Sequence, residues 1–210
     1  MINVFIADDH AIVRQGVKQV LSEYPDIKLT GEAADGQEVL RQARTEVWDV
    51  LVLDLSLPDC SGLDVLKSLK HEQPNLPVLV LSMHAEDQFA LRCLKAGASG
   101  YLTKESVPEE LVKAIRKAAV GRKYISSNLA ETLAFGLQTT ADQPRHASLS
   151  DREFQVVQRM GAGKTTKEIA EELSLSVKTV STYRARILEK LDLKTSAAII
   201  HYAVQNGLID

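Results

Sequence analysis

Cysteine, aromatic side chains and long apolar runs are all scarce in this 210-residue chain. The two cysteines, Cys60 and Cys93, are too few for a disulfide framework and lack the CxxC spacing of a zinc site. No run of 18 apolar residues occurs, and the N-terminus has two aspartates where a signal peptide needs a basic region followed by an apolar one. We therefore expect a cytoplasmic protein that has reduced thiols and does not interact with a membrane.

Apolar residues make up 45% of the chain, which is enough to bury a substantial core, and the length suits two domains. The net charge of −3 is unevenly divided. Residues 1–121 hold 18 Asp and Glu against 13 Lys and Arg, whereas residues 122–210 hold 10 against 12. A surplus of two positive charges is a weak argument for a nucleic-acid partner, so that function has to be argued from motifs.

Five short apolar runs alternate with helix-period segments through residue 121. The runs are INVFIA (2–7), IKLTGEA (27–33), DVLVLD (49–54), PVLVLS (77–82) and ASGYLT (98–103). The segments between them place apolar residues three and four apart. Five β-α units predict a flavodoxin-like α/β domain, with a five-stranded parallel sheet in the order 2-1-3-4-5 and helices on both faces.

The pattern changes after residue 121. Residues 122–147 contain a polar, proline-containing stretch, which predicts a linker, preceded by a short helix around NLAETLAFGL (128–137). Residues 148–210 show helical periodicity throughout, and four short helices without strands predict a compact all-α second domain.

Polar residues stand at the ends of four of the five apolar runs. Asp8 and Asp9 follow the first run, Asp54 ends the third, Ser82 ends the fourth and Lys104 follows the fifth. The predicted order makes these four strands contiguous, so the side chains should meet at the carboxyl edge of the sheet. Three clustered carboxylates need a hard cation, for which Mg²⁺ is suited. Asp54 can then act as a carboxylate nucleophile toward a phosphoryl group, whose oxygens Lys104 and Ser82 stabilise.

This first half resembles the receiver domain of two-component response regulators. The resemblance rests on the pair at Asp8 and Asp9, on DLSLPDCSG around Asp54, on LSMH with Ser82, and on GYLTKE with Tyr101 and Lys104. It implies that Asp54 accepts a phosphoryl group from a sensor histidine kinase. One departure from many receivers is Glu105, which follows the lysine where proline is common.

The same resemblance implies further roles at this site. Asp9, Asp54 and the Ser56 carbonyl would ligate Mg²⁺, and Asp8 would act through a bound water. Ser82 and Tyr101 would move together as a switch, with Ser82 drawn to the phosphate and Tyr101 turning inward behind it.

The stretch GAGKTT (161–166) has the look of a nucleotide-binding P-loop but fails the motif. The first glycine would have to be residue 158, which is Gln158. The stretch also follows a helical segment, where a P-loop follows a strand. We therefore expect a glycine-containing turn between two helices, with Thr165 or Thr166 capping the second.

A helix-turn-helix is predicted over residues 167–191. Its first helix buries Ile169, Ala170 and Leu173. The apolar stripe of its second helix is Val177, Val180, Ile187, Leu188 and Leu191. The other face of the second helix has hydroxyls, small side chains and basic groups, which suit base edges and phosphates: Lys178, Thr179, Ser181, Thr182, Arg184, Ala185 and Arg186.

The second half resembles the LuxR-type DNA-binding domain. The hallmarks are Leu149–Glu153, Gly161, KEIAEEL, SVKTVSTYRARILEKL and the final apolar helix. The resemblance implies a recognition helix in the major groove of double-stranded DNA, with Ser181, Thr182 and Ala185 facing bases. Lys178, Thr179, Arg184 and Arg186 would mainly hold phosphates.

Together the two halves resemble NarL/FixJ-type response regulators, which are bacterial transcription factors rather than enzymes. The implied partners are a histidine kinase, DNA, a second copy of the chain on phosphorylation or DNA binding, and RNA polymerase as a further candidate. Candidate dimer surfaces are the first and fifth receiver helices and the C-terminal helix SAAIIHYAVQ.

Two alternative functions remain. The first is a phosphohydrolase, but such enzymes with an aspartyl nucleophile commonly have a second acid two residues on, where this chain has Ser56. The second is a protein-docking module with no role in DNA binding, which leaves the recognition-helix pattern unexplained.

Overall fold

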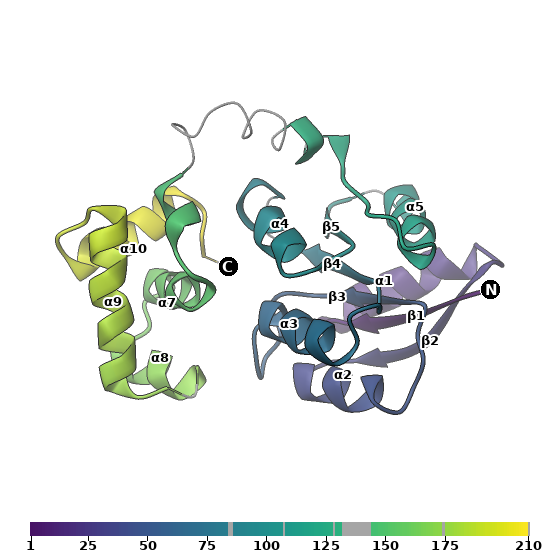
Figure 1. The fold of residues 1–210 in the computed structure, drawn as a ribbon, viewed down its shortest axis with the longest axis horizontal. Helices are drawn as coiled ribbons and strands as arrows, with labels where there is room; N and C mark the ends of the chain where they lie inside the picture. The colour runs from purple at the N-terminus through teal and green to yellow at the C-terminus, as the bar shows by residue number, and fades with distance from the viewer. Residues whose placement is uncertain (84–85, 107, 128, 132–143, 174, 210) are drawn as a thin grey trace. The chain divides into compact units, whose positions relative to one another are not determined.

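The computed structural model describes residues 1–83, 86–106, 108–127, 129–131, 144–173 and 175–209. The chain divides into two compact units, Met1–Leu133 and Ala134–Asp210, and each is described by itself (Figure 1). The short helix predicted around residues 128–137 lies mostly outside the described residues. Within those residues, no helix is long and apolar enough to cross a membrane.

The first unit is built on a parallel sheet whose order, β2-β1-β3-β4-β5, confirms the prediction. Its strands are β1 (Ile2–Ala7), β2 (Ile27–Ala33), β3 (Val50–Leu53), β4 (Val78–Ser82) and β5 (Gly100–Thr103). All residues of β3 and β4 are buried, because central strands of a parallel sheet are covered on both faces. The edge strand β2 alternates between buried and more exposed residues.

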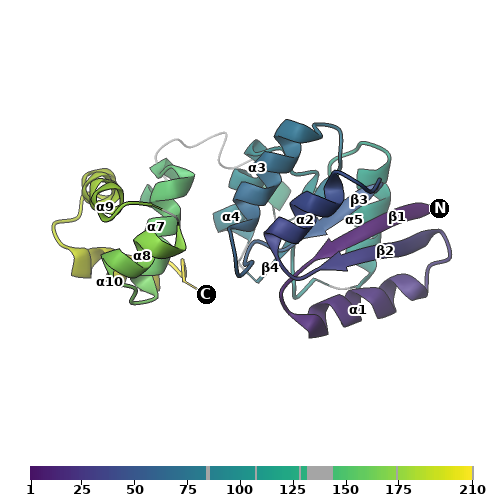
Figure 2. The same ribbon diagram turned by 90° about the horizontal axis from the view of Figure 1, so that it is seen from below.

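In the described part of the first unit, five helices flank this sheet. They are α1 (Ala11–Ser22), α2 (Gly36–Ala43), α3 (Gly62–Glu72), α4 (Glu86–Lys95) and α5 (Pro108–Ala119). The helices α1 and α5 share one core cluster with the strands, in which Val17 and Ile115 are buried. Figure 2 shows α1 on one side of the sheet and α2 and α3 on the other. The core continues beyond residue 121, since Tyr124 is 5% exposed and its N–H donates to the Ser99 carbonyl.

The second unit is helical in its described part. A 3-10 helix, η1 (Arg145–Ser148), precedes α7 (Asp151–Gly161), α8 (Thr166–Glu172), α9 (Val177–Leu191) and α10 (Ser196–Gln205). Thr165 caps α8 in a capping box with Glu168, and Gly163 has φ of 80° in the turn before it. GAGKTT is thus a turn between two helices, as predicted.

Buried residues of α8 and α9 hold the helix-turn-helix together. Ile169, Val180 and Ile187 are at most 1% exposed. Val177, predicted as part of the apolar stripe, is instead 50% exposed. It is the first residue of α9, and the end of a helix has fewer packing neighbours than its middle.

Candidate functional site

The carboxyl ends of β1, β3 and β5 bring two buried carboxylates to one lysine. Asp8 and Asp54 are each 1% exposed. Lys104 donates a hydrogen bond from Nζ to Asp54 Oδ2 at 2.7 Å, and the same Nζ lies 2.8 Å from Asp8 Oδ2 in an ion pair that lacks hydrogen-bond alignment. One ammonium therefore serves two carboxylates, which leaves the site with surplus negative charge. We call the group of Asp8, Asp9, His10 and Asp54 the acidic pocket.

Burial and the contact between Asp54 and Lys104 shift the pKa of each of these two groups in opposite directions. Burial raises the pKa of Asp54, and the neighbouring charge of Asp8 adds to this, while Lys104 lowers it; the pKa lies above the ordinary value. Burial lowers the pKa of Lys104, but its contacts with Asp54 and Asp8 outweigh burial, so this pKa is also raised. The lysine thus keeps its positive charge.

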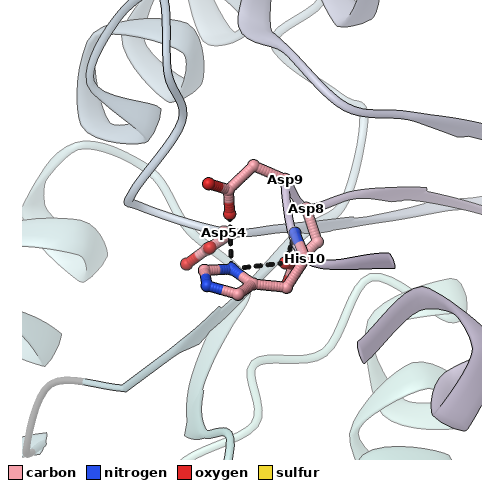
Figure 3. A group of neighbouring side chains, drawn as sticks. All are labelled: Asp8, Asp9, His10 and Asp54. Atoms are coloured by element: carbon pink, nitrogen blue, oxygen red, sulfur yellow. Dashed lines mark hydrogen bonds and ion pairs between the residues drawn. The ribbon is translucent and has the colours of Figure 1, made fainter. Parts of the chain in front are cut away.

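Two oxygens of the pocket are buried without a hydrogen-bond partner among the described residues. Asp8 Oδ2 still has the ion pair with Lys104, whereas Asp54 Oδ1 is the oxygen that Lys104 does not contact. A buried acceptor left without a partner costs about 1–3 kcal/mol, and more when it is charged. Ligand atoms from all four residues of the acidic pocket lie within 4.8 Å of one another (Figure 3). The oxygen donors and the unpartnered atom fit a hard divalent cation such as Mg²⁺.

The remaining predicted residues of the first unit lie near this edge of the sheet. Ser82 ends β4 and is fully buried, and its carbonyl accepts the backbone N–H of Lys104. Tyr101 on β5 pairs with Val80 on β4 and is also fully buried. Ser56 is half-buried in the loop after β3 and forms an isolated bridge with Ser61. Asp9 is more open, with its side chain 34% exposed.

Sequence reasoning missed Asp59, which anchors the loop after β3. Its carboxylate accepts the backbone N–H groups of Gly36 and Gln37 at 2.8 Å each, at the N-terminus of α2. Burial raises the pKa of Asp59, but these two hydrogen bonds outweigh burial and hold the pKa below its ordinary value. The charge also faces the positive end of the α2 dipole. The loop that follows Asp54 is thereby tied to a neighbouring helix.

Gly62 and Arg14 also support the site and were missed. A Cβ at Gly62 would collide with the Asp54 carbonyl and the Leu55 Cα, so the start of α3 packs directly on the backbone after β3. Arg14 on α1 donates from Nη1 to the Asp8 carbonyl at 2.7 Å. The composition of DLSLPDCSG hints at a tight turn, but no local pattern shows which helix or loop a side chain will meet.

In the second unit, the face of α9 predicted to meet DNA is accessible. Its members, none of which is buried, are Lys178, Thr179, Ser181, Thr182, Arg184, Ala185 and Arg186. The Ser181 and Thr182 hydroxyls donate to backbone carbonyls four residues earlier, at 2.9 and 3.0 Å. Arg184 donates from Nη1 to Ser196 Oγ at 3.3 Å. The helix α9 thus presents basic and hydroxyl groups on the face opposite its buried apolar residues.

Comparison with known proteins matches both halves of the chain to protein families. Residues 4–116 match the response regulator receiver domain, and residues 147–203 match the bacterial regulatory proteins of the LuxR family. The chain therefore belongs to the response regulator family. It is a two-component response regulator with a LuxR-type DNA-binding domain, which makes it a transcription factor of the NarL/FixJ type and not an enzyme.

Relatives match along nearly the whole chain. Response regulator UvrY of Escherichia coli (strain K12) is 35% identical over 209 residues, covering 99% of this chain and 96% of UvrY. Response regulator GacA of Pseudomonas aeruginosa is 36% identical, covering 100% and 99%. Among solved structures, RcsB from Salmonella enterica serovar Typhimurium, bound to promoter rprA in the presence of the phosphomimetic BeF3⁻, has a TM-score of 0.76. It is 27% identical over 96% of this chain and 97% of RcsB.

Proposed function

We propose that phosphorylation of Asp54 switches this protein and that the switch controls DNA binding by α9. The observation that carries the proposal is the arrangement at Asp54. Lys104 holds Oδ2 and leaves Oδ1 buried and without a hydrogen-bond partner among the described residues. One oxygen is thus oriented by a cation while the other is available to form a bond.

Transfer of a phosphoryl group to Asp54 requires mainly that the phosphorus atom be positioned next to Asp54 Oδ1. As Asp54 Oδ1 bonds to phosphorus, the bond from phosphorus to the histidine nitrogen of a sensor kinase breaks, and its electron pair stays on that nitrogen. Lys104 already serves two carboxylates and can move to an oxygen of the transferred group. We propose that the fully buried Ser82 also contacts the transferred phosphoryl group. Tyr101, on the adjacent strand β5, would then move together with Ser82 as the switch.

A divalent cation, Mg²⁺ by the chemistry of the donors, would offset the negative charge of the pocket when bound. Asp9, Asp54 and the Ser56 carbonyl would hold it, with Asp8 acting through a water. The group of carboxylates within 4.8 Å supports this assignment. The pocket provides more negative charge than Lys104 alone can balance, which is what a cation site requires.

For the second unit, we propose that Ser181, Thr182 and Ala185 face bases in the major groove while the neighbouring basic residues hold phosphates. RcsB, which is bound to promoter DNA in the presence of a phosphomimetic, supports this function. A structure of two RcsB dimers on two DNAs likewise supports a homodimer as the DNA-bound form. RNA polymerase is a further candidate partner. Shifting the protein from a 1:99 to a 99:1 ratio of its DNA-binding state to its inactive state takes about 5.5 kcal/mol.

The first test is phosphorylation with Mg²⁺ and a small phosphodonor such as acetyl phosphate. We expect the intact mass to rise by one phosphoryl group, with a label that is acid-stable and base-labile. Asp54→Asn should take up no label, whereas the control Asp49→Asn, an exposed aspartate that accepts the Asn3 N–H, should be labelled normally. Label on Asp54→Asn, or steady multiple turnover of the donor, would contradict the proposal.

The second test concerns DNA. Arg184→Ala should weaken the binding of genomic fragments and flatten the salt dependence by about one phosphate contact. Arg44→Ala removes the same charge from the first unit, where Arg44 pairs with Glu72, and serves as the matched control. An equal loss of DNA affinity in both variants would show a general effect of charge. Unchanged DNA affinity in Arg184→Ala would contradict the placement of α9 at the DNA interface.

A further inference from the structure

The acidic pocket contains a nitrogen donor for which the phosphorylation chemistry has no use. His10 Nδ1 lies 2.5 Å from Asp9 Oδ1 and 3.5 Å from Asp8 Oδ1 (Figure 3). The backbone N–H of His10 donates to Asp8 Oδ1 at 2.8 Å, which fixes the residue beside the buried carboxylate. Its side chain is 59% exposed, so the imidazole lies where an ion could enter from solvent.

These separations are close to those of ligands that share one ion. Adjacent ligands of a six-coordinate ion with bonds of about 2.1 Å lie about 3 Å apart. The two distances from His10 Nδ1, 2.5 and 3.5 Å, fall on either side of that value. An imidazole nitrogen and two carboxylate oxygens are therefore placed so that small side-chain rotations would bring all three to one cation.

The unpartnered oxygen of Asp54 is a second and independent indication of a ligand. The side chain is 1% exposed, and its Oδ1 has no hydrogen-bond partner among the described residues. Lys104 Nζ contacts the Oδ2 atoms of Asp54 and Asp8, whereas Asp8 Oδ1 accepts the His10 N–H and so lies on the side of the pocket that His10 shares. Asp54 also offers a ligand atom within 4.8 Å of those of Asp8, Asp9 and His10. The available donors are thus carboxylate oxygens together with one imidazole nitrogen.

We propose that His10 is a ligand through Nδ1 when the acidic pocket binds a transition-metal dication such as Mn²⁺ or Zn²⁺. Mg²⁺ takes oxygen ligands, whereas imidazole suits zinc and the other first-row transition metals. The pocket then binds two classes of cation with different ligand sets. This inference rests on the proposed role of the pocket as a cation site.

Calorimetric titration of tag-free, full-length protein with Mg²⁺, Mn²⁺ and Zn²⁺ tests the ligand set. We expect His10→Ala and His10→Gln to lower the ratio of Zn²⁺ to Mg²⁺ affinity by about tenfold or more. His71→Ala is the matched control, because His71 lies exposed in the last turn of α3 and should leave the ratio unchanged. Unfolding followed through Trp48 establishes that each variant is folded.

Pulsed electron paramagnetic resonance of bound Mn²⁺ gives a direct signature. Coupling to a ¹⁴N nucleus should appear in the unsubstituted protein and in His71→Ala, and should be lost in both His10 variants. Coupling that persists in the His10 variants, or an unchanged affinity ratio, would overturn the assignment and leave an Asp9–His10 ion pair only. Failure of the pocket to bind Mg²⁺ would instead contradict the proposed cation site itself.

Discussion

Replacing Asp54 by asparagine should stabilise the metal-free first unit although it removes an ion pair. Burial raises the pKa of Asp54, so the folded state binds the proton more tightly than the unfolded state does. At pH values above the folded pKa, ionised Asp54 therefore opposes folding, and this penalty fades as the pH falls through the folded pKa. A neutral asparagine removes the penalty at pH 7.

The size of the effect follows from three opposing contributions. With an effective dielectric constant of about 20, the Lys104 contact at 2.7 Å is worth about 6 kcal/mol. The substitution also removes the repulsion between Asp54 and Asp8, whose oxygens lie within 4.8 Å, and this relief is worth about 3.5 kcal/mol. The net electrostatic loss on substitution is therefore about 2.5 kcal/mol. It is smaller than the several kcal/mol that folding spends on desolvating the Asp54 carboxylate, a cost that asparagine avoids. We expect a net gain of about 2 kcal/mol in the free energy of unfolding.

The chain offers a selective probe for this measurement. Its one tryptophan, Trp48, is 6% exposed and stacks on Phe5 at 4.1 Å, so its fluorescence in urea follows the first unit alone. In EDTA, Asp54→Asn should unfold at higher urea than the unsubstituted protein, and Asp49→Asn should unfold near it. Added Mg²⁺ should stabilise the unsubstituted protein and narrow the difference, because it binds only the folded pocket. Lower stability of Asp54→Asn in EDTA would refute the reasoning.

Two further predictions concern the supports of the site. Asp59→Ala should cost the first unit about 1 kcal/mol at pH 7, since its exposed carboxylate is partly screened. Because the pKa of Asp59 is lowered, urea unfolding should show this difference fully above the ordinary pKa of aspartate and lose it as the pH falls through the folded pKa. Gly62→Ala should cost about 1–3 kcal/mol and slow labelling of Asp54, because its Cβ meets backbone atoms. In contrast, Gly16→Ala on α1, where the Cβ meets open space, should add up to about 1 kcal/mol in the same assay.

Much of the first unit could be predicted because its strands are short apolar runs with clear limits. The run predicted at residues 77–82 is the strand Val78–Ser82, and the order of all five strands follows the prediction. Parallel strands place their carboxyl ends at one edge, so the meeting of Asp8, Asp54 and Lys104 followed from topology alone.

The sequence does not contain the contacts that form across long separations. Asp59 caps a helix that begins 23 residues earlier, and nothing in its neighbourhood indicates that partner. Periodicity placed Val177 in the apolar stripe, but Val177 is 50% exposed. Periodicity shows which face of a helix a residue lies on, and it does not show whether a neighbouring helix extends far enough to cover that residue. The orientation of His10 toward Asp9 is likewise set by the backbone turn after β1, which residue types alone do not define.

The central claim is that phosphorylation at Asp54 controls DNA binding by the second unit. The most direct test is the affinity of the full-length protein for a selected genomic DNA fragment, with and without Mg²⁺ and BeF3⁻ or acetyl phosphate, at one fixed salt concentration. The account predicts that phosphorylation raises the affinity of the unsubstituted protein and leaves Asp54→Asn unchanged. Equal affinities for the unmodified and the stoichiometrically phosphorylated protein would contradict it.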